Sequence, residues 1–350
     1  MKVGESNPLV EVTRGEIVES LHYGAFIVVD SDGKIVWCEG SPSMLTYPRS
    51  SIKPFQALPL IEHGGDQVFH LTPQEIAITC ASHSGTELHR DVLRGMHAKI
   101  GLKETDLACG VHWPGDAETR AAMRQAGEQP TPFHHNCSGK HTGMLALACL
   151  LGQSTEGYLD PQHPIQVIIR ETLADMIGLP PESMPVGVDG CSAPVYGIPL
   201  YNMAWAVARL VDPIHLDDTR ASACQKITSA MIAHPVMIAG PGKFDTDLME
   251  AAGGKLISKG GAEGYQIIGI LPGVNDRARG LGVAIKISDG DPRGRARSCV
   301  SLSILDALGV LDREDLSQLS AYGNVPVKNW RQRNVGEVRP AFSIAPMDQN

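Results

Sequence analysis

The pattern of apolar and polar positions near both ends of the chain is typical of strands, with alternation of period two near the start and short Ile- and Val-rich segments near the end. Residues 9–14 alternate in this way. Two apolar runs, at 24–30 and 34–38, flank the turn Asp30-Ser31-Asp32-Gly33 and predict a hairpin. Short segments rich in Ile and Val, separated by glycine-rich turns, predict further strands in the last third of the chain, at 255–258, 265–271, 282–287 and 336–343.

The middle of the chain shows helical spacing instead. A helix is expected from Ser50, with Pro59 inside it as a source of a kink. Another should start at Thr72-Pro73, a cap residue followed by proline. The remaining helices are expected at about 86–100, 116–126, 139–151, 163–178, 197–212, 216–233 and 295–309. Segment 139–151 is apolar on nearly all sides, which predicts a buried helix.

The order of elements is therefore strands, helices, then strands again. One antiparallel sheet built from about 9–40 and 255–345, with a mostly helical region at about 50–250, is the simplest way to bury these faces. We expect a mixed α+β fold in which residues 1–350 form a single catalytic domain.

Charge and composition limit the class of protein. The formal net charge is −9, which argues against nucleic acid or an anionic membrane as the main partner. No apolar run is long enough to cross a bilayer, and Met1 to Arg14 has no export signal, so a cytoplasmic protein is expected. In that compartment the eight cysteines should be thiols or metal ligands rather than disulfides.

Ser50 and Lys53 are the first candidate chemical pair. Pro54 lacks an N–H and its ring clashes with the carbonyl four residues back, so the helix should begin at about Ser50. Positions i and i+3 then place the hydroxyl and the amine on one face of its first turn. A lysine that has lost its proton could take one from the serine and create a nucleophile. A surface lysine near an ordinary helix start is the alternative.

Three further polar clusters stand out. Ser82-His83-Ser84-Gly85 follows the helix that starts at Pro73. The cluster His134-His135-Asn136-Cys137-Ser138-Gly139-Lys140-His141 opens the buried helix. This second cluster is either a capped helix start with a free cysteine, or a metal site of Cys137 and Lys140 closed by a distant Cys or His. The third cluster is Ser258 to Gly264, in which Lys259 precedes two glycines. This pattern is consistent either with a turn that carries a solvated lysine or with a strand edge that lies beside a ligand.

Ser50/Lys53 on an early helix, with Lys259-Gly260-Gly261 on a late strand, is similar to the penicillin-recognising serine enzymes, which combine S-x-x-K on a helix with K-[TS]-G on a C-terminal strand. The order of strands, helices and strands agrees with that architecture. Together these features favour a catalytic role for Ser50.

The chain resembles the rhizobial-type (class 3) L-asparaginases along nearly its whole length. The resemblance rests on five motifs in order: Pro48-Arg49-Ser50-Ser51-Ile52-Lys53-Pro54, Cys80-Ala81-Ser82-His83-Ser84-Gly85, His135 to His141, Val188-Asp189-Gly190-Cys191, and Ser258-Lys259-Gly260-Gly261-Ala262-Glu263-Gly264. It implies a serine β-lactamase-like fold, a homodimer, and hydrolysis of L-asparagine to L-aspartate and ammonia.

The same resemblance implies two Ser–Lys pairs, Ser50 with Lys53 and Ser82 with Lys259. It also implies a zinc ion bound by Cys137, Lys140 and Cys191 beside the serines, where it aids substrate binding without being strictly required.

On this basis we expect acyl transfer, with Ser50 as nucleophile, Lys53 as base, and Ser82 and Lys259 relaying protons or positioning water. Four residues are candidates for contacts with the substrate. They are Arg49 for the carboxylate, Asp189 for the ammonium or a metal-bound water, and His135 and Asn136. A surface salt bridge is the alternative for Arg49.

Rival functions are a glutaminase, or a β-lactamase, peptidase or esterase on the same fold. A glutaminase differs by one methylene of substrate, which is worth only about 1–3 kcal/mol of discrimination. The missing export signal argues against β-lactams as substrates. A binding protein that kept the fold without catalysis is a third possibility, and the intact serines and lysines argue against it.

Overall fold

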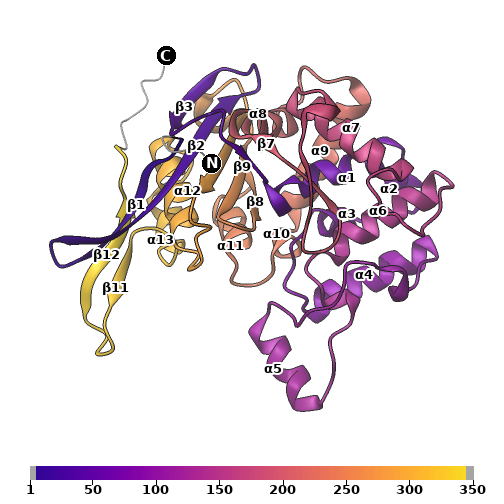
Figure 1. Cartoon of the computed structure of the whole chain (residues 1–350), viewed down its shortest axis with the longest axis horizontal. Helices are drawn as coiled ribbons and strands as arrows, with labels where there is room; N and C mark the ends of the chain where they lie inside the picture. Colours follow the sequence, from indigo (N-terminus) through magenta and orange to yellow (C-terminus); the bar gives the residue numbers. More distant parts are fainter. Residues whose placement is uncertain (1–4, 344–350) are drawn as a thin grey trace. The chain divides into compact units, whose positions relative to one another are not determined.

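A computed structural model describes residues 5–343 and shows a mixed α+β protein (Figure 1). The chain forms two compact units. The first comprises the described residues up to Pro48, then Ile198–Asp212, and the described residues from Asp247 onward. The second comprises Arg49–Gly197 and Pro213–Thr246. Whether the two units act as one catalytic domain stays a prediction.

The first unit contains an eight-stranded antiparallel sheet in the order β11-β12-β1-β2-β10-β9-β8, with β3 paired to β2. The strands are β1 (Asn7–Arg14), β2 (Ile17–Asp30), β3 (Ile35–Glu39), β8 (Leu256–Gly261), β9 (Tyr265–Ile270), β10 (Leu281–Ile287), β11 (Val325–Lys328) and β12 (Asn334–Pro340). The two ends of the chain meet where β1 pairs with β12 and β2 with β10. The predicted antiparallel sheet from both ends is confirmed.

Two helices pack on this sheet. Helix α8 (Leu200–Val211) lies against β2, β9 and β10, and α12 (Ala296–Ala307) lies against β1, β10 and β12. The approach of α8 is so close that a Cβ atom on Gly282 would meet the carbonyl oxygen of Ala204 at 1.9 Å. Glycine at this strand position is therefore required by packing.

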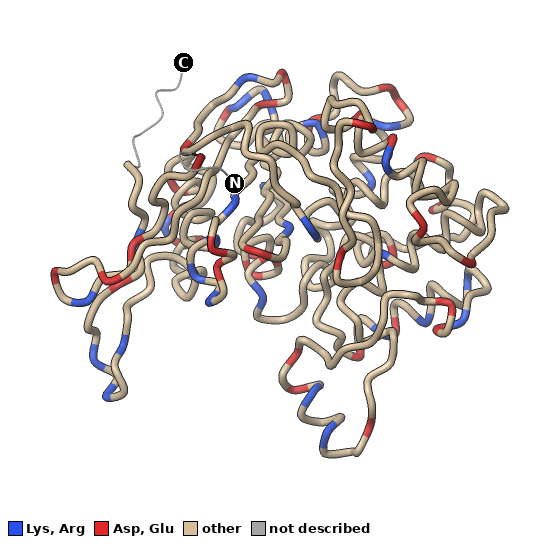
Figure 2. The backbone as a smooth tube through the Cα atoms, in the orientation of Figure 1, with Lys and Arg blue, Asp and Glu red and all other residues tan. Residues whose placement is uncertain are grey.

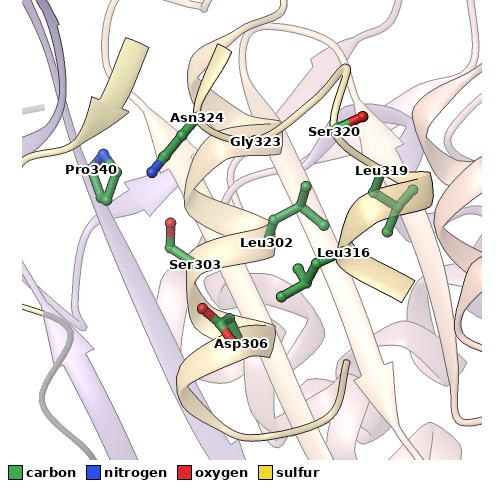
Figure 3. Close-up of a pocket in the computed structure, with 9 residues that line it drawn as sticks. All are labelled: Leu302, Ser303, Asp306, Leu316, Leu319, Ser320, Gly323, Asn324 and Pro340. Carbon is green, nitrogen blue, oxygen red and sulfur yellow. The ribbon is translucent and has the colours of Figure 1, made fainter. Parts of the chain in front are cut away.

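A pocket of about 290 Å³ lies beside α12 and α13 (Arg313–Gln318), as Figure 3 shows. Leu302 and Leu316 form part of its apolar wall, and Asp306 and Asn324 supply polar groups.

Two short strands, β4 (Leu45–Thr46) and β7 (Ile198–Pro199), form a separate pair in the first unit.

The second unit is mainly helical. Its longer elements are the 3₁₀ turn η1 (Arg49–Ile52), α1 (Lys53–Glu62), α3 (Pro73–Thr79), α4 (Glu87–Ile100), α5 (Ala117–Ala126), α6 (Ser138–Leu150), α7 (Pro164–Ile177) and α9 (Asp218–Ala233). Shorter ones are α2 (Gly65–Val68), η2 (Glu104–Asp106), η3 (Pro132–His134), η4 (Pro181–Ser183), α10 (Pro235–Ile238) and the hairpin β5 (Val186–Val188)–β6 (Pro194–Tyr196). Helix α11 (Phe244–Ala251) spans the boundary between the two units.

Helix α6 lies at the centre of the second unit, in contact with α1, α3, α4 and α7. Each residue from Ser138 to Ala148 is buried. A Cβ on Gly139 would meet the carbonyl oxygen of Ile78 at 2.0 Å, so the start of α6 crosses directly over α3. The prediction of a buried helix is confirmed, and its first residues are held in the core of the unit.

Several elements were not expected from the sequence, among them β11, the β5–β6 hairpin and α13. These elements are short or mostly polar, and every second residue of β11 is exposed to solvent. Their hydrophobic periodicity is therefore too weak to predict them from the sequence. Pro59 lies inside α1, and the helix continues past it to Glu62.

Basic and acidic side chains are interspersed along both units, as Figure 2 shows. None of the eight cysteines, all of which lie within residues 5–343, forms a disulfide, in agreement with the expectation of thiols or metal ligands rather than disulfides. Among residues 5–343, no helix has both the length and the apolar character needed to span a membrane.

Candidate functional site

The segment Arg49 to Lys53 begins the second unit. Ser50 lies in η1, and the α-helix proper begins at Lys53, with Pro54 in its first turn, where the missing N–H costs nothing. Arg49 adopts φ 53°, in the left-handed region that non-glycine residues avoid. Backbone strain of this kind, of order 1–3 kcal/mol, persists only where neighbouring contacts fix the residue.

Lys53 is buried and directed toward the segment that follows α3. Its Nζ donates hydrogen bonds to the carbonyl oxygen of Ala81 at 2.5 Å and to Ser82 Oγ at 2.9 Å. Across residues 5–343 no hydrogen bond joins Lys53 to Ser50, which is half-buried one turn earlier. The structure thus brings Lys53 to the second predicted serine.

The segment that carries Ser82 is anchored on two sides. The Ser82 N–H donates to the carbonyl oxygen of Ile238 at 2.8 Å. Gly85 has φ 72°, and a Cβ there would meet the carbonyl oxygen of His134 at 2.7 Å. Only glycine fits this turn.

His83 lies next to Ser82 and is 1% exposed. The Gly85 N–H donates to its Nδ1 at 3.1 Å, so Nε2 carries the proton and donates to Ser138 Oγ at 2.9 Å. Burial, and to a lesser degree the nearby His89 and Lys53, hold the pKa of His83 well below its ordinary value. The ring is therefore neutral at pH 7.

Cys137, Lys140 and Cys191 come together at the start of α6. All three are at least 95% buried. Lys140 Nζ donates to Cys191 Sγ at 3.0 Å, and the Cys191 thiol donates in turn to Cys137. The structure therefore brings together the three residues that the family resemblance implies as zinc ligands.

The charges of this cluster follow from these contacts. The hydrogen bond from Cys191, aided by the positive charges of Lys53 and Lys140, holds the pKa of Cys137 well below that of a free thiol although burial opposes it. The same hydrogen bond and burial raise the pKa of Cys191. Burial alone would lower the pKa of Lys140, but the two sulfur atoms outweigh it and the pKa is raised. These contacts favour the thiolate form of Cys137 and the protonated forms of Cys191 and Lys140.

Arg49 and Asp189 pair with each other. Arg49 Nη2 and Nε both donate to Asp189 Oδ1, at 2.6 and 2.9 Å. Asp189 Oδ1 also accepts from the Gly190 N–H at 2.7 Å. The ion pair fixes the strained backbone at Arg49 and connects the residue before Ser50 to the loop that carries Cys191.

His135 and Asn136 directly precede Cys137 in the chain. The Cys137 N–H donates to His135 Nδ1 at 3.0 Å. The Asn136 N–H donates to Nε2 of His112 at 3.0 Å, and the rings of His112 and His135 lie 4.3 Å apart. His112 was not singled out from the sequence, because a lone histidine in a loop has no local pattern to mark it.

Lys259 lies on β8 in the first unit, where it is buried and its Nζ donates to the carbonyl oxygen of Gly260 at 2.7 Å. Its predicted partnership with Ser82 stays a prediction.

The predicted zinc ligands fit a metal in their chemistry. Thiolates and a neutral amine are soft or borderline donors that suit zinc, and three ligands leave an open position. Among residues 5–343 no group of three His, Cys, Asp or Glu side chains gathers as a conventional metal site would. The Cys137–Lys140–Cys191 cluster has only two such side chains, because its third is a lysine.

The family of the chain follows from its sequence as a whole. Residues 10–340 match the family model described as L-asparaginase II. The chain belongs to the L-asparaginase II family. This L-asparaginase II family member is accordingly an amidohydrolase. No curated protein matches it in sequence.

Solved structures that it resembles include a probable glutaminase from Bacillus subtilis in complex with 6-diazo-5-oxo-L-norleucine. That chain is 14% identical, with 82% of this chain and 85% of the other covered and a TM-score of 0.40. A Bacillus glutaminase in 4.3 M NaCl is 13% identical over 82% and 91% of the two chains, with a TM-score of 0.39.

Proposed function

We propose that this protein hydrolyses L-asparagine to L-aspartate and ammonia through an acyl-enzyme on Ser50. Membership of the L-asparaginase II family supports the reaction. The observation that carries the mechanism is the buried Lys53 amine, which lies 2.9 Å from Ser82 Oγ and begins the helix next to Ser50. A buried amine beside serine hydroxyls can act as the base of a serine–lysine nucleophile. The hydroxyl that Lys53 contacts here is that of Ser82, so its action on Ser50 is part of the proposal.

In the proposed sequence, Ser50 Oγ attacks the side-chain amide carbon and Lys53 accepts its proton. The tetrahedral oxyanion is proposed to be held by backbone N–H groups near the start of α1, to which Pro54 cannot contribute because it has no N–H. The proton then passes to the leaving nitrogen, ammonia departs, and water hydrolyses the ester. Transfer from Ser50 to Lys53 requires their separation to close when substrate binds, since catalytic hydrogen bonds are often long without it.

Ser82 and Lys259 are proposed to relay the proton or position the water. The contact of Lys53 with Ser82 supports the first part of this relay, because a proton taken by Lys53 can pass on through that hydroxyl. Ser82 is also the alternative nucleophile, since it is the hydroxyl that Lys53 contacts in the absence of substrate.

Recognition of the amino-acid part of the substrate is proposed for Arg49 and Asp189, with His135 and Asn136 nearby. Arg49 retains Nη1 for a carboxylate, and Asp189 retains Oδ2 for an ammonium while Oδ1 holds the arginine. An ion pair that already carries both charges is complementary to a zwitterion.

A zinc ion is proposed on Cys137, Lys140 and Cys191. When bound, it would supply positive charge and an open coordination position beside the serines. A homodimer is proposed from the family resemblance alone, and the expected cytoplasmic location stays a prediction.

The test is ammonia release from L-asparagine and L-glutamine, with and without added zinc, by the wild type, Ser50→Ala and Ser82→Ala. We expect asparagine to be preferred, and Ser50→Ala to lose at least a thousandfold in kcat. A trapped acyl-enzyme should map to Ser50 by peptide mass spectrometry. An adduct on Ser82, or near-native turnover by Ser50→Ala, would overturn the assignment. Preference for glutamine, or turnover of a chromogenic β-lactam, would establish a rival activity.

A further inference from the structure

We infer that His83 is a positioning residue that fixes the Ser82 segment to the start of α6, so that the serine and the Cys137–Lys140–Cys191 cluster keep one geometry. The inference rests on the proposed function for its kinetic consequence. Its structural part stands on contacts within the second unit alone.

A directed series of hydrogen bonds carries the inference. The Gly85 N–H donates to His83 Nδ1, and His83 Nε2–H donates to Ser138 Oγ at 2.9 Å. Ser138 Oγ then donates to the carbonyl oxygen of Phe133 at 3.3 Å. Every donor in this series has an acceptor only if the His83 ring is neutral and carries its proton on Nε2. The ring has therefore a single favoured orientation.

The role of this hydrogen-bond series follows from the positions of His83 and Ser138 in the chain. His83 directly follows Ser82, and Ser138 directly follows Cys137. One buried hydrogen bond thus connects the residue after the serine to the residue after the thiolate. Lys53 holds the Ser82 side chain, but its other bond goes to Ala81 on the same segment, so it does not connect that segment to α6.

Stacking against a second histidine further restricts the orientation of the His83 ring. His89 lies against His83 with ring centroids 4.9 Å apart and an interplanar angle of 17°. His89 is itself held by a contact of its Nε2 with the carbonyl oxygen of Val236 at 2.9 Å. Displacement of His83 would break a buried hydrogen bond and this stack together, so loss of the ring should loosen the Ser82 segment as a unit.

A second histidine provides a matched comparison one turn along α6. His97 Nε2 contacts Thr142 Oγ1 at 2.9 Å, and Thr142 Oγ1 donates to the carbonyl oxygen of Ser138. Both histidines thus bond a hydroxyl of α6 from inside the core. His97 belongs to α4 and not to the serine segment, so its loss should cost stability without misplacing Ser82.

The experiment compares His83→Leu, His83→Gln, Ser138→Ala and His97→Leu as full-length proteins. Asparagine hydrolysis gives kcat and KM, and urea unfolding gives stability. Iodoacetamide labelling of the metal-free protein, followed by peptide mapping, gives the alkylation rate of Cys137. For His83→Leu we expect kcat to fall by about tenfold to a hundredfold with KM little changed, because small displacements of reacting groups have effects of this size. Its Cys137 should be alkylated several-fold faster.

His83→Gln offers an amide N–H to Ser138 and should recover most of both effects, and Ser138→Ala should reproduce those of His83→Leu. His97→Leu should be destabilised comparably, with wild-type kcat and alkylation rate. Equal losses in the two leucine variants, or no rescue by glutamine, would overturn the inference. If the wild type hydrolyses no amide, the proposed function fails, and the alkylation rates still decide for or against the role of His83.

Discussion

If the proposed zinc ion binds to the Cys137–Lys140–Cys191 cluster, its uptake is expected to release about two protons at pH 7. The contacts in the metal-free cluster favour the thiolate of Cys137, because they hold its pKa well below that of a free thiol. Cys191 and Lys140 have raised pKa values and retain their protons. A metal ligand must be deprotonated, so each of these two loses one proton when zinc binds.

The magnitude follows from the count. Two protons released per zinc make the apparent affinity rise about a hundredfold for each unit of pH, or about 2.7 kcal/mol at about 1.36 kcal/mol per proton and unit. This slope applies between the lowered pKa of Cys137 and the raised pKa values of its two partners. At pH values below the pKa of Cys137, that residue is also protonated and releases a third proton when zinc binds, so the apparent affinity depends more steeply on pH.

The assay is calorimetric titration of metal-free protein with zinc at pH 7, in buffers of different ionisation enthalpy, which gives the number of protons directly. Affinity at several pH values gives the slope independently. Lys140→Met preserves the volume of the side chain and removes one source of a proton, so its count should fall to about one. Release of three protons by the wild type would show that Cys137 is a thiol, and an unchanged count in Lys140→Met would exclude the lysine as a ligand.

Three further outcomes are expected. Gly139→Ala should lower the free energy of unfolding in urea by several kcal/mol, because its Cβ would lie 2.0 Å from a carbonyl oxygen. Gly95→Ala in α4 is the control: the nearest atom to its Cβ is 3.7 Å away, so it should be neutral or stabilising by up to about 1 kcal/mol. Equal effects of the two substitutions would refute the packing argument. His83 is neutral when folded and has a pKa near 6.5 when unfolded, so stability should fall as pH drops below about 6.5, by up to about 1.4 kcal/mol per unit from this residue. His83→Gln should reduce that slope by about one proton, and an identical slope would contradict it. Lys53→Met should lower kcat by about a hundredfold to ten-thousandfold while the far-ultraviolet circular dichroism stays native, and near-native kcat would exclude Lys53 as the base.

Much of the fold follows from local patterns in the sequence. Helix α3 begins at the predicted residue because Thr72, Pro73 and Glu75 form a capping box with proline in the first turn. Strands β9 and β10 lie within a residue of their expected bounds because continuous Ile and Val runs ended by glycine admit few alternatives. Strand β11 was missed because it alternates between polar and half-buried positions at the edge of the sheet.

The candidate site divides in the same way. The sequence by itself determined which residue types are available, and the family resemblance carried by the order of the motifs implied that Ser50, Lys53, Ser82 and the cysteine–lysine cluster act together. Only the tertiary structure decided which of them meet. It placed Lys53 on Ser82, paired Arg49 with Asp189, and brought Cys191 to Lys140 across 51 residues of chain. Such contacts depend on how buried helices pack, and packing is set by the shapes of many residues together, so no local spacing encodes it.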